Sequence, residues 1–182
     1  MKEYETSRLV LKTLDTTHAG LALDFHRRNA DFLQAWEPTK EGGYYTLQYH
    51  AEMLVRESTL MENGSLLRLW IFKKAEEDRA IGSIGFSNIL YGPFQSCFLG
   101  YKIDKDEINR GYATEAIRKG IEIIFGKYGL HRIEDNIMPG NKRSLRVAEK
   151  LGFHDEGLAK HYLKINGKWE DHIHMVLLNE HS

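Results

Sequence analysis

The chain has little of several features that mark specialised classes of protein. Its 182 residues include a single cysteine, Cys97, so neither an intrachain disulfide nor a cysteine-rich metal site can form. No apolar run reaches the length of about 20 residues that a membrane-spanning helix needs, and the first residues lack the apolar centre of a signal peptide. These absences lead us to expect a cytoplasmic protein without a membrane partner.

The numbers of positively and negatively charged residues are nearly equal, and the common phosphate-binding signatures are missing. The formal net charge is −1, so we expect no direct nucleic-acid partner bound through bulk charge. Neither the Walker sequence G-x-x-x-x-G-K-[ST] nor the dinucleotide fingerprint G-x-G-x-x-G occurs. His172 and His174 would share one face of a strand, but the sequence offers no third ligand, so we expect no metal site.

What is present describes one ordinary globular domain. Hydrophobic residues make up 42% of the chain and charged residues 28%, which is usual for globular proteins. A chain of 182 residues can bury a substantial core without disulfides or metal ions. No linker, internal repeat or low-complexity tract divides the sequence, so we expect a single domain over residues 1–182.

The order of periodic patterns predicts a mixed α+β fold. Asn166-Gly167 between two strand-like runs signals a two-residue hairpin, and short polar connections between residues 67 and 103 predict an antiparallel meander. The strand over 131–138 follows a crossover helix, so it should run parallel to the strand over 98–103. A short segment, irregular or helical, stops at Pro38. The expected helices cover 19–29, 47–61, 113–128 and 141–151, and the expected strands cover 8–12, 67–72, 80–86, 96–103, 131–138, 157–165 and 168–178.

The stretch from Phe98 to Tyr128 joins a strand, a glycine-containing turn and a long helix. The first turn of a helix leaves N–H groups without partners and carries a partial positive charge. Gly111 can adopt a positive φ and lets a ligand approach the backbone closely, and Arg110 adds a cation. Glu115 lies in the first turn of the helix, where its negative charge interacts favourably with the helix dipole, and it is expected to pack under the turn. The stretch is therefore a candidate phosphate site, although an ordinary strand-to-helix connection has the same outline.

The residues of this turn resemble the acetyl-coenzyme A pyrophosphate loop of the GNAT acetyltransferases, written [QR]-x-x-G-x-[GA]. Gly111 and Ala113 fill the last two motif positions. Ile108 stands where Gln or Arg is usual, and Asn109 stands where glycine is common. These departures remove one side-chain contact and stiffen the turn, but they leave the backbone amides available. The run that carries the resemblance is Asn109-Arg110-Gly111-Tyr112-Ala113-Thr114-Glu115-Ala116.

The order of expected elements is also similar to the whole GNAT fold. That resemblance implies a mixed, mostly antiparallel sheet of about seven strands with one splayed parallel pair, flanked by about four helices. From about residue 32 to residue 178 the chain resembles one branch, the RimJ-type ribosomal-protein-alanine N-acetyltransferases. The segments that carry this likeness are F-L-x-x-W-E-P at 32–38, F-S-N at 86–88, C-x-L-G-Y at 97–101, H-R-I at 131–133, M-P-x-N-K-R-S at 138–144, L-G-F-x-x-E-G at 151–157 and A-K-x-Y-L-x-I-x-G-x-W-x-D-H at 159–172.

The resemblance implies acetyl-CoA as co-substrate and no metal. In the family the parallel strands part, and the pantetheine arm pairs with exposed backbone, here near Tyr101 to Ile103, as an added strand would. From the residues alone, Gly100-Tyr101 could equally be ordinary strand packing. The implied coenzyme-binding residues are Tyr101, Lys102, Ile103, Ile108, Asn109, Arg110, Gly111, Tyr112, Ala113, Thr114, Asn141 and Ser144.

Asn141 and Ser144 share the first turn of a helix and are the implied catalytic pair. By spacing alone, Asn141 would cap the helix and Ser144 would face solvent. The resemblance implies instead that Asn141 hydrogen-bonds the coenzyme arm and that Ser144 protonates or hydrogen-bonds the departing thiolate, because Ala148 stands where many GNAT enzymes carry a tyrosine. Cys97 has no base evident in the sequence, and we do not expect it to form a covalent intermediate.

The general base is less well defined by the sequence. Leu163 stands where some related enzymes carry a glutamate. Glu37 is our expected catalytic base, with Glu156, Asp171 and His172 as alternatives and water as a possible carrier of the proton. Each of these residues could also be a plain surface or hairpin charge.

The implied reaction is acetyl transfer to a primary amine by direct attack, preferably to the N-terminal alanine or other small residue of a ribosomal protein. An α-amino group ordinarily has a pKa of about 7.7–8, so only a modest base is needed. Phe32, Trp36, Glu37 and Asp171 are the implied acceptor-binding residues, although Phe32 and Trp36 could equally pack in the core. Two alternatives stay open: a small-amine acetyltransferase acting on an amino-acid derivative, polyamine or aminoglycoside, and a non-catalytic acetyl-CoA-binding, ribosome-associated module. The protein could be a monomer or a homodimer.

Overall fold

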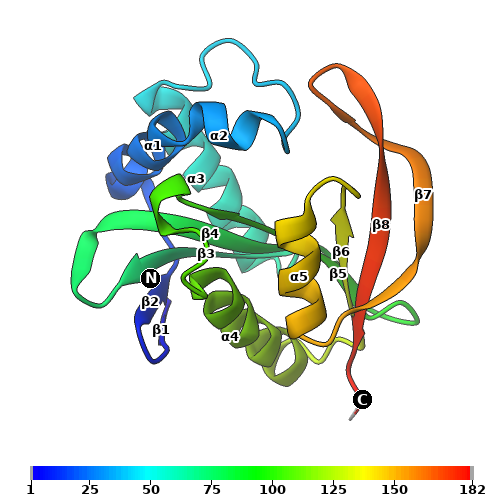
Figure 1. Ribbon diagram of the computed structural model, residues 1–182. Coiled ribbons are helices and arrows are strands. Elements are labelled where there is room, and N and C mark those ends of the chain that lie inside the picture. Colours follow the sequence, from blue (N-terminus) through cyan, green and yellow to red (C-terminus); the bar gives the residue numbers. More distant parts are fainter. Residues whose placement is uncertain (1, 181–182) are drawn as a thin grey trace.

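The computed structural model of the protein describes residues 2–180, in which one sheet is covered by helices on both faces (Figure 1). Within residues 2–180, eight strands lie side by side in the order β1-β2-β3-β4-β5-β6-β8-β7. The α-helices and strands are β1 (Glu3–Glu5), β2 (Leu9–Lys12), α1 (Ala19–Arg28), α2 (Ala30–Gln34), α3 (Leu47–Glu62), β3 (Leu66–Lys73), β4 (Glu76–Leu90), β5 (Ser96–Ile103), α4 (Tyr112–Lys127), β6 (Arg132–Ile137), α5 (Lys142–Lys150), β7 (His154–Ile165) and β8 (Lys168–Leu178).

All the strands and long helices expected from the sequence are present. The β3–β4–β5 meander is antiparallel, β6 runs parallel to β5, and the turn at Asn166-Gly167 closes the β7–β8 hairpin. The structure adds β1, which pairs with β2, and of the two forms expected ahead of Pro38, irregular or helical, it has the short helix α2. The three residues of β1 are too few to show an alternating pattern, which explains why the sequence did not reveal this strand.

Two apolar clusters lie on opposite faces of the sheet, and β3 contributes to both. Trp70 and Phe72 pack with Phe25 of α1 and Leu54 of α3. Leu69, which directly precedes Trp70, belongs to the cluster on the α4 and α5 side. Successive side chains of a strand point to opposite faces, so a strand buried on both sides reads as a nearly continuous apolar run.

Helix α4 lies very close to the sheet because one of its residues lacks a side chain. A Cβ atom added to Gly120 would lie 2.5 Å from the ring of Phe86 on β4, closer than real contacts allow. This close approach fixes the height of α4 above the sheet. It therefore also fixes the position of the turn that precedes the helix.

Strands β5 and β6 pair over only part of their length. The parallel register runs from Ser96 opposite Arg132 to Leu99 opposite Asp135, and it goes no further. Beyond Leu99, residues 100–103 stay paired with β4 on one side only. The two strands thus part at Leu99, which leaves a free backbone edge on β5.

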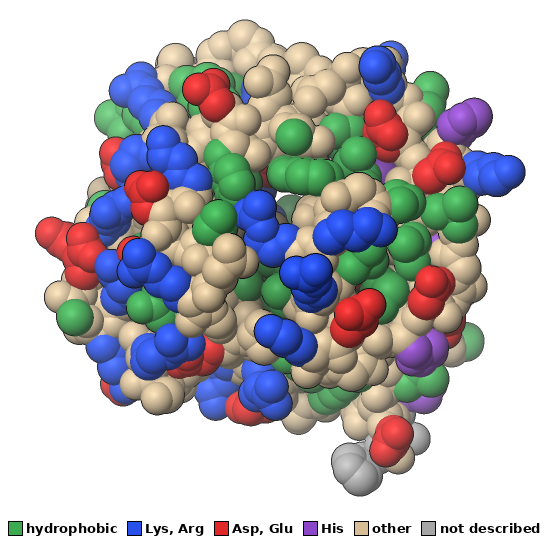
Figure 2. Space-filling model, viewed as in Figure 1, with side chains coloured by type: hydrophobic (Ala, Val, Ile, Leu, Met, Phe, Trp, Pro, Cys, Tyr) green, Lys and Arg blue, Asp and Glu red, His purple; other side chains and the backbone are tan. Residues whose placement is uncertain are grey.

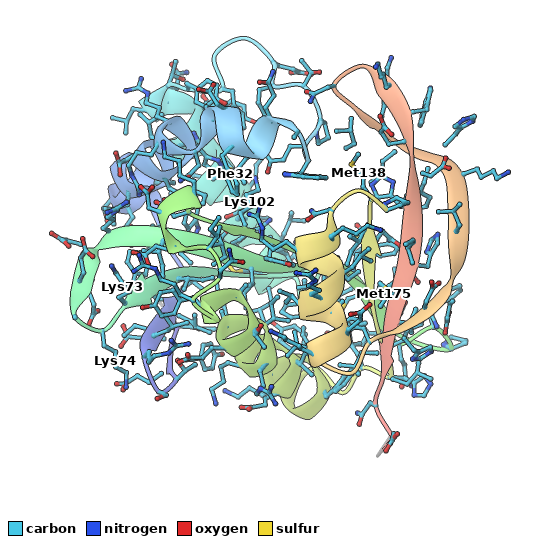
Figure 3. All side chains as sticks on the ribbon, in the orientation of Figure 1. Phe32, Lys73, Lys74, Lys102, Met138 and Met175 are labelled. Carbon is cyan, nitrogen blue, oxygen red and sulfur yellow. The ribbon has the colours of Figure 1, made fainter. Side chains whose placement is uncertain are left out.

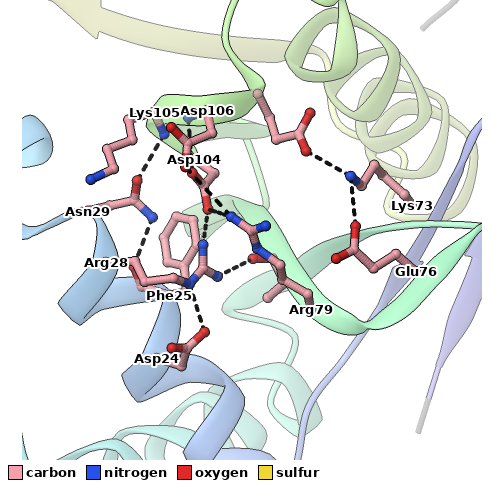
Figure 4. A network of polar contacts seen from close by, with 12 residues as sticks. Asp24, Phe25, Arg28, Asn29, Lys73, Glu76, Arg79, Asp104, Lys105 and Asp106 are labelled. Atoms are coloured by element: carbon pink, nitrogen blue, oxygen red, sulfur yellow. Dashed lines mark hydrogen bonds and ion pairs between the residues drawn. The ribbon is translucent and has the colours of Figure 1, made fainter.

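A buried network ties the end of β5 to helix α1 (Figure 4). The side chain of Asp104 is fully buried and is ion-paired with Arg28 and with Arg79, the latter at 3.3 Å. Asn29 accepts a 2.8 Å hydrogen bond from the backbone N–H of Lys105. Because Asp104 directly precedes the turn into α4, this network holds the start of that turn in place.

Replacing Asp104 with asparagine is expected to lower the free energy of unfolding by about 2 kcal/mol at pH 7, since it takes a carboxylate from two arginines. Burial acts to raise the pKa of Asp104, but the backbone N–H of Asp106 and the charge of Arg28 outweigh it and lower that pKa. The stabilisation is therefore present above the ordinary aspartate pKa of 3.8 and is lost as the pH falls through the folded-state value.

Urea unfolding of wild type and Asp104→Asn at pH 7 and pH 3 measures this effect, and the difference between them should shrink at pH 3. The matched control is Asp106→Asn. The Asp106 side chain is 66% exposed, and its ion pair with Arg79 is long at 3.8 Å, so its charge should contribute little to stability. This control should change stability by less than about 0.5 kcal/mol. Equal losses in the two variants would contradict the account of the network.

Candidate active site

A cleft of about 590 Å³ opens where α2, the end of β5, the start of α4, the end of β6 and α5 meet. Figure 2 shows Lys and Arg side chains gathered on the face of the molecule that carries α4 and α5. In Figure 3, Phe32 and Lys102 lie beside α2 near the middle of the molecule, whereas Lys73 and Lys74 lie at its edge. Phe32 and Lys102 line the cleft.

The amino end of α4 faces the cleft with its backbone amides free of any side-chain cap. Gly111 is the N-cap residue, with φ of 80°, and among residues 2–180 no side-chain cap bonds to the backbone N–H groups at this end. Asn109 also has a positive φ, 60°, a conformation that asparagine tolerates better than most residues. Gly111 and residues 112–114 line the cleft. The arrangement provides unpaired N–H donors and the positive end of a helix dipole for an anion.

Arg8 is a second positive group at this place, and the sequence analysis did not find it. Its Nη1 donates to the carbonyl oxygen of Arg110 at 3.0 Å, and a Cβ atom added to Gly111 would lie 3.4 Å from its Nη2. Glu115 holds Arg8 through a 2.7 Å ion pair and accepts a 2.7 Å hydrogen bond from Thr6. Glu115 thus contacts Thr6 and Arg8, and it is linked to the turn through Arg8.

Arg8→Ala is expected to weaken coenzyme A binding about fivefold at low salt and less at high salt, since an exposed cation beside a helix terminus contributes up to about 1 kcal/mol. Isothermal titration at two salt concentrations measures this change. Lys74→Ala is the matched control, because Lys74 is similarly exposed and pairs with Glu5 instead. A loss of affinity that is the same in both variants would contradict the role of Arg8.

Ser144 and Asn141 lie on the cleft wall at the start of α5. Asn141 is the N-cap residue of α5. Its Oδ1 accepts a hydrogen bond from the backbone N–H of Ser144, with 3.2 Å between the oxygen and the nitrogen. The hydroxyl of Tyr101 donates to Ser144 Oγ at 3.0 Å. Burial raises the pKa of Tyr101, so this phenol keeps its proton. Because Ser144 Oγ is the acceptor in that bond, its own O–H remains able to donate into the cleft.

Glu37 lies in the cleft wall but is held by two lysines. Lys102 pairs with one carboxylate oxygen, and Lys40 lies 2.6 Å from the other. Burial acts to raise the pKa of Glu37, but the charges and hydrogen bonds of these lysines outweigh it, and the pKa is lowered. A carboxylate in this state is a weak proton acceptor. The geometry therefore does not favour Glu37 as the general base.

Two of the expected site residues do not line the cleft. Arg110 pairs with Glu107 at 3.1 Å, and Asp171 accepts the backbone N–H of His161 at 2.8 Å within the β7–β8 hairpin. Glu156, an alternative base, is bound to Arg132 at 2.6 Å. The expected residues that do line the cleft are Phe32, Trp36, Glu37, Tyr101, Lys102, Ile103, Ile108, Asn109, Gly111, Tyr112, Ala113, Thr114, Asn141 and Ser144.

His172 is the candidate base that the structure places best. It is buried and lines the cleft. Its Nδ1 lies 3.0 Å from the carbonyl oxygen of Glu170. A carbonyl oxygen only accepts, so Nδ1 is the donor in this hydrogen bond and Nε2 is the nitrogen left to exchange a proton with a ligand. Cys97, by contrast, is buried in the core, where burial raises the pKa of its thiol to about 12, so it is no nucleophile at neutral pH.

Arg146, Lys150 and Asp135 line the cleft as well, although they were not predicted as site residues from the sequence. On α5, Arg146 follows Arg143 by three residues and Lys150 follows Arg146 by four. This spacing places the three cations on one side of the helix. That spacing was readable in the sequence, although nothing there indicated that this side faces a cleft. Asp135 lies two residues from both Ile133 and Ile137 on β6 and shares their buried face, so its position had the pattern of a core residue.

Comparison with known proteins agrees with this arrangement. Residues 8–154 match the family model described as the acetyltransferase (GNAT) domain. The chain is 36% identical over 171 residues to the probable N-acetyltransferase YjcK of Bacillus subtilis (strain 168), covering 94% of each protein. It is 35% identical over 170 residues to the [ribosomal protein uS5]-alanine N-acetyltransferase of Escherichia coli (strain K12), covering 92% of this chain and 86% of that one.

A solved structure, Mycobacterium smegmatis RimJ in complex with CoA-disulfide, superposes with a TM-score of 0.87 at 26% identity, covering 94% of this chain and 82% of that one. A helix with a free amino end beside a splayed parallel pair, in one cleft, thus defines a GNAT-type acyltransferase fold. The chain belongs to the GNAT acetyltransferase family, and within it resembles the ribosomal-protein-alanine acetyltransferases. Among residues 2–180, no helix is long and apolar enough to cross a membrane.

Proposed function

We propose that this GNAT enzyme transfers the acetyl group of acetyl-CoA to the N-terminal alanine, or another small N-terminal residue, of a ribosomal protein. The observation that carries the proposal is the convergence of three features on one cleft: the uncapped amino end of α4, the free edge of β5 beyond Leu99, and the hydroxyl of Ser144. Each meets a different part of the coenzyme. The first suits its diphosphate, the second its amide-bearing arm, and the third its sulfur.

The chain's own residues would hold the coenzyme as follows. The amides of residues 111–114 and the guanidinium of Arg8 face the diphosphate. The backbone of Tyr101 to Ile103, unpaired on the β6 side, offers N–H and C=O groups to the amides of the arm. The cations Arg143, Arg146 and Lys150 of α5 line the same cleft and suit the remaining phosphate.

Ser144 would act on the leaving group. The bound coenzyme supplies an activated acetyl thioester. In the step we propose, a bond forms between the acceptor nitrogen and the acetyl carbon, the carbon–sulfur bond breaks, and its electron pair stays on sulfur. The O–H of Ser144 donates to that sulfur, while Tyr101 donates to Ser144 Oγ and compensates the negative charge that develops there.

His172 would take up the proton that the acceptor amine loses, directly or through one water. Its Nε2 carries a lone pair and the residue lines the cleft, whereas Glu37 has a lowered pKa. Asn136, also on the cleft wall, donates to the hydroxyl of Tyr162, whose ring packs against His172 with centroids 5.5 Å apart. These contacts hold the imidazole in one orientation.

A second cavity of about 300 Å³ supports a peptide as acceptor. It shares Leu33 and Glu37 with the main cleft and continues past them toward Tyr44 and Tyr45. The β7–β8 hairpin forms one wall, because Asn166 lines this cavity and donates to the carbonyl oxygen of Gln34. An extended chain entering here has room beyond its first residue. Phe32 and Trp36 would line its path.

The test is a thiol-release screen with acetyl-CoA against peptides that begin with alanine or serine, the same peptides with a blocked amino end, and small amines that include a polyamine, an amino-acid derivative and an aminoglycoside. We expect release with the free peptides and none with the blocked ones. Faster release with a small amine would replace the proposed acceptor. Saturable coenzyme binding without release on any amine would favour a non-catalytic module.

A further inference from the structure

Asp135 differs from the other carboxylates that line the cleft. Glu37 pairs with two lysines, and Glu107 pairs with Lys73 at 2.8 Å and with Arg110. Asp135 is only 6% exposed, and its carboxyl has neither an ion pair nor a hydrogen bond among residues 2–180. A buried carboxyl without partners is uncommon because its desolvation is costly, so this one calls for an explanation.

Its position is the point at which the two parallel strands part. Leu99 and Asp135 form the last pair of the β5–β6 register, and Asp135 lies between the buried Ile133 and Ile137 on β6. On the other side of β6, Asp135 is paired with Met175 of β8. An arm inserted between the parted strands would therefore end against this side chain.

The surroundings of Asp135 favour its neutral form. Burial raises its pKa to about 7, and among residues 2–180 no charged group offsets that effect. Ile117 of α4 belongs to the same apolar cluster as Ile133 and Ile137. The pKa of Tyr101 is raised mainly by burial and, in second place, by the negative charge that Asp135 carries when it is ionised. Besides Asp135, the titratable or charged side chains that line the cleft are Glu37, Arg68 of β3, Tyr101 and Lys102 of β5, Glu107, Tyr112 of α4, Arg143, Arg146 and Lys150 of α5, and His172 of β8.

We propose that Asp135 enters the coenzyme complex as the neutral carboxylic acid and donates a hydrogen bond to the arm of the coenzyme, so that binding takes up one proton. This inference rests on the coenzyme-binding part of the proposed function, because it needs the coenzyme in the cleft, and it does not depend on acetyl transfer. The arm carries amide and thioester carbonyls, which accept hydrogen bonds, and the coenzyme as a whole is anionic. A neutral carboxyl satisfies such an acceptor, whereas a carboxylate would repel the ligand and leave its oxygens unpaired.

The sign of the pH dependence follows from this proton uptake. Bound coenzyme excludes water from Asp135 and accepts a hydrogen bond from its neutral form, so the pKa of Asp135 is higher in the complex than in the free protein. At a pH above the pKa that Asp135 has in the free protein, the carboxylate must take up a proton each time the coenzyme binds. The affinity for coenzyme A should therefore fall about tenfold for each pH unit above that value, until the pKa of the complex is reached.

The experiment is isothermal titration with coenzyme A at pH 6 and pH 8 in two buffers of different ionisation enthalpy, which counts protons taken up. Wild type should take up about one more proton at pH 8 than Asp135→Asn. The asparagine keeps the shape and a donor group but cannot titrate, so its affinity should match wild type at pH 6 and exceed it at pH 8. Asp106→Asn, an exposed aspartate outside the cleft, should behave as wild type.

Three results would overturn the inference: equal proton uptake by wild type and Asp135→Asn, loss of binding by Asp135→Asn at pH 6, or no proton uptake by wild type at pH 8. The third result, no proton uptake by wild type at pH 8, needs no variant. It therefore tests the inference even if Asp135→Asn fails to fold. Coenzyme binding without acetyl transfer would remove the proposed function and leave this inference standing. No coenzyme binding at all would remove both.

Discussion

Replacing Ser144 with alanine is expected to lower kcat for the preferred peptide at least about a hundredfold, because general-acid and hydrogen-bond assistance to a leaving group contributes at least about this factor. The departing thiolate would lose the O–H that Tyr101 positions at 3.0 Å. Binding of coenzyme A should change little, since the diphosphate and arm contact other residues. The measurement is steady-state thiol release, with binding followed separately by titration.

Two further variants sharpen this test. Tyr101→Phe removes only the hydroxyl that donates to Ser144, so it should lower kcat by a smaller factor than Ser144→Ala. Ser58→Ala is the matched control, since Ser58 is also a helical serine with a hydrogen bond to a side chain, Glu62, but lies on α3 outside the cleft. Unchanged turnover in Ser144→Ala would show that another group protonates the sulfur.

Asp135→Asn is expected to raise the free energy of unfolding at pH 8 by as much as about 4 kcal/mol. The pKa of Asp135 is about 7 in the folded protein, against an ordinary aspartate value of 3.8, and each pKa unit corresponds to about 1.4 kcal/mol. With a raised folded pKa, the unfolded chain binds fewer protons than the folded chain between these values. Wild-type stability is therefore lost as the pH rises from about 4 to 7, and asparagine avoids that loss.

Denaturant unfolding of wild type and Asp135→Asn at pH 4 and pH 8 measures this difference. The variant should gain at pH 8 and show little change at pH 4, where the folded protein keeps Asp135 protonated and the unfolded chain is about half protonated. Asp104→Asn provides a contrast within the same protein, because that carboxylate has two arginine partners and its replacement should destabilise. A loss of stability in Asp135→Asn at pH 8 would mean that the carboxylate has a cationic partner.

Local sequence signals predicted much of the fold and part of the cleft. The apolar periodicity of α4, the crossover to β6 and the Asn166-Gly167 turn were each sufficient to place an element. Gly111 was singled out because a positive φ at the start of a helix favours glycine, and the structure has it there. These features depend on residues that are close in sequence, which is why a single chain reveals them.

Contacts between distant residues could not be predicted in the same way. Arg8 reaches the turn at Arg110 from the other end of the chain, and Lys102 approaches Glu37 from a different element. The alternating pattern of β6 placed Asp135 on the inner face but did not indicate that this face opens into a cleft. Such pairings depend on how strands and helices pack, and one sequence does not encode them in any local pattern.

The central claim is that the amino end of α4 binds the coenzyme diphosphate, and amide chemical shifts test it most directly. In ¹⁵N-labelled protein, coenzyme A should cause its largest shifts at the backbone amides of residues 109–114, and pantetheine, which lacks the diphosphate, should leave these amides nearly unchanged. If coenzyme A and pantetheine shift the amides of residues 109–114 equally, or if coenzyme A leaves them in place while shifting others, the account is contradicted.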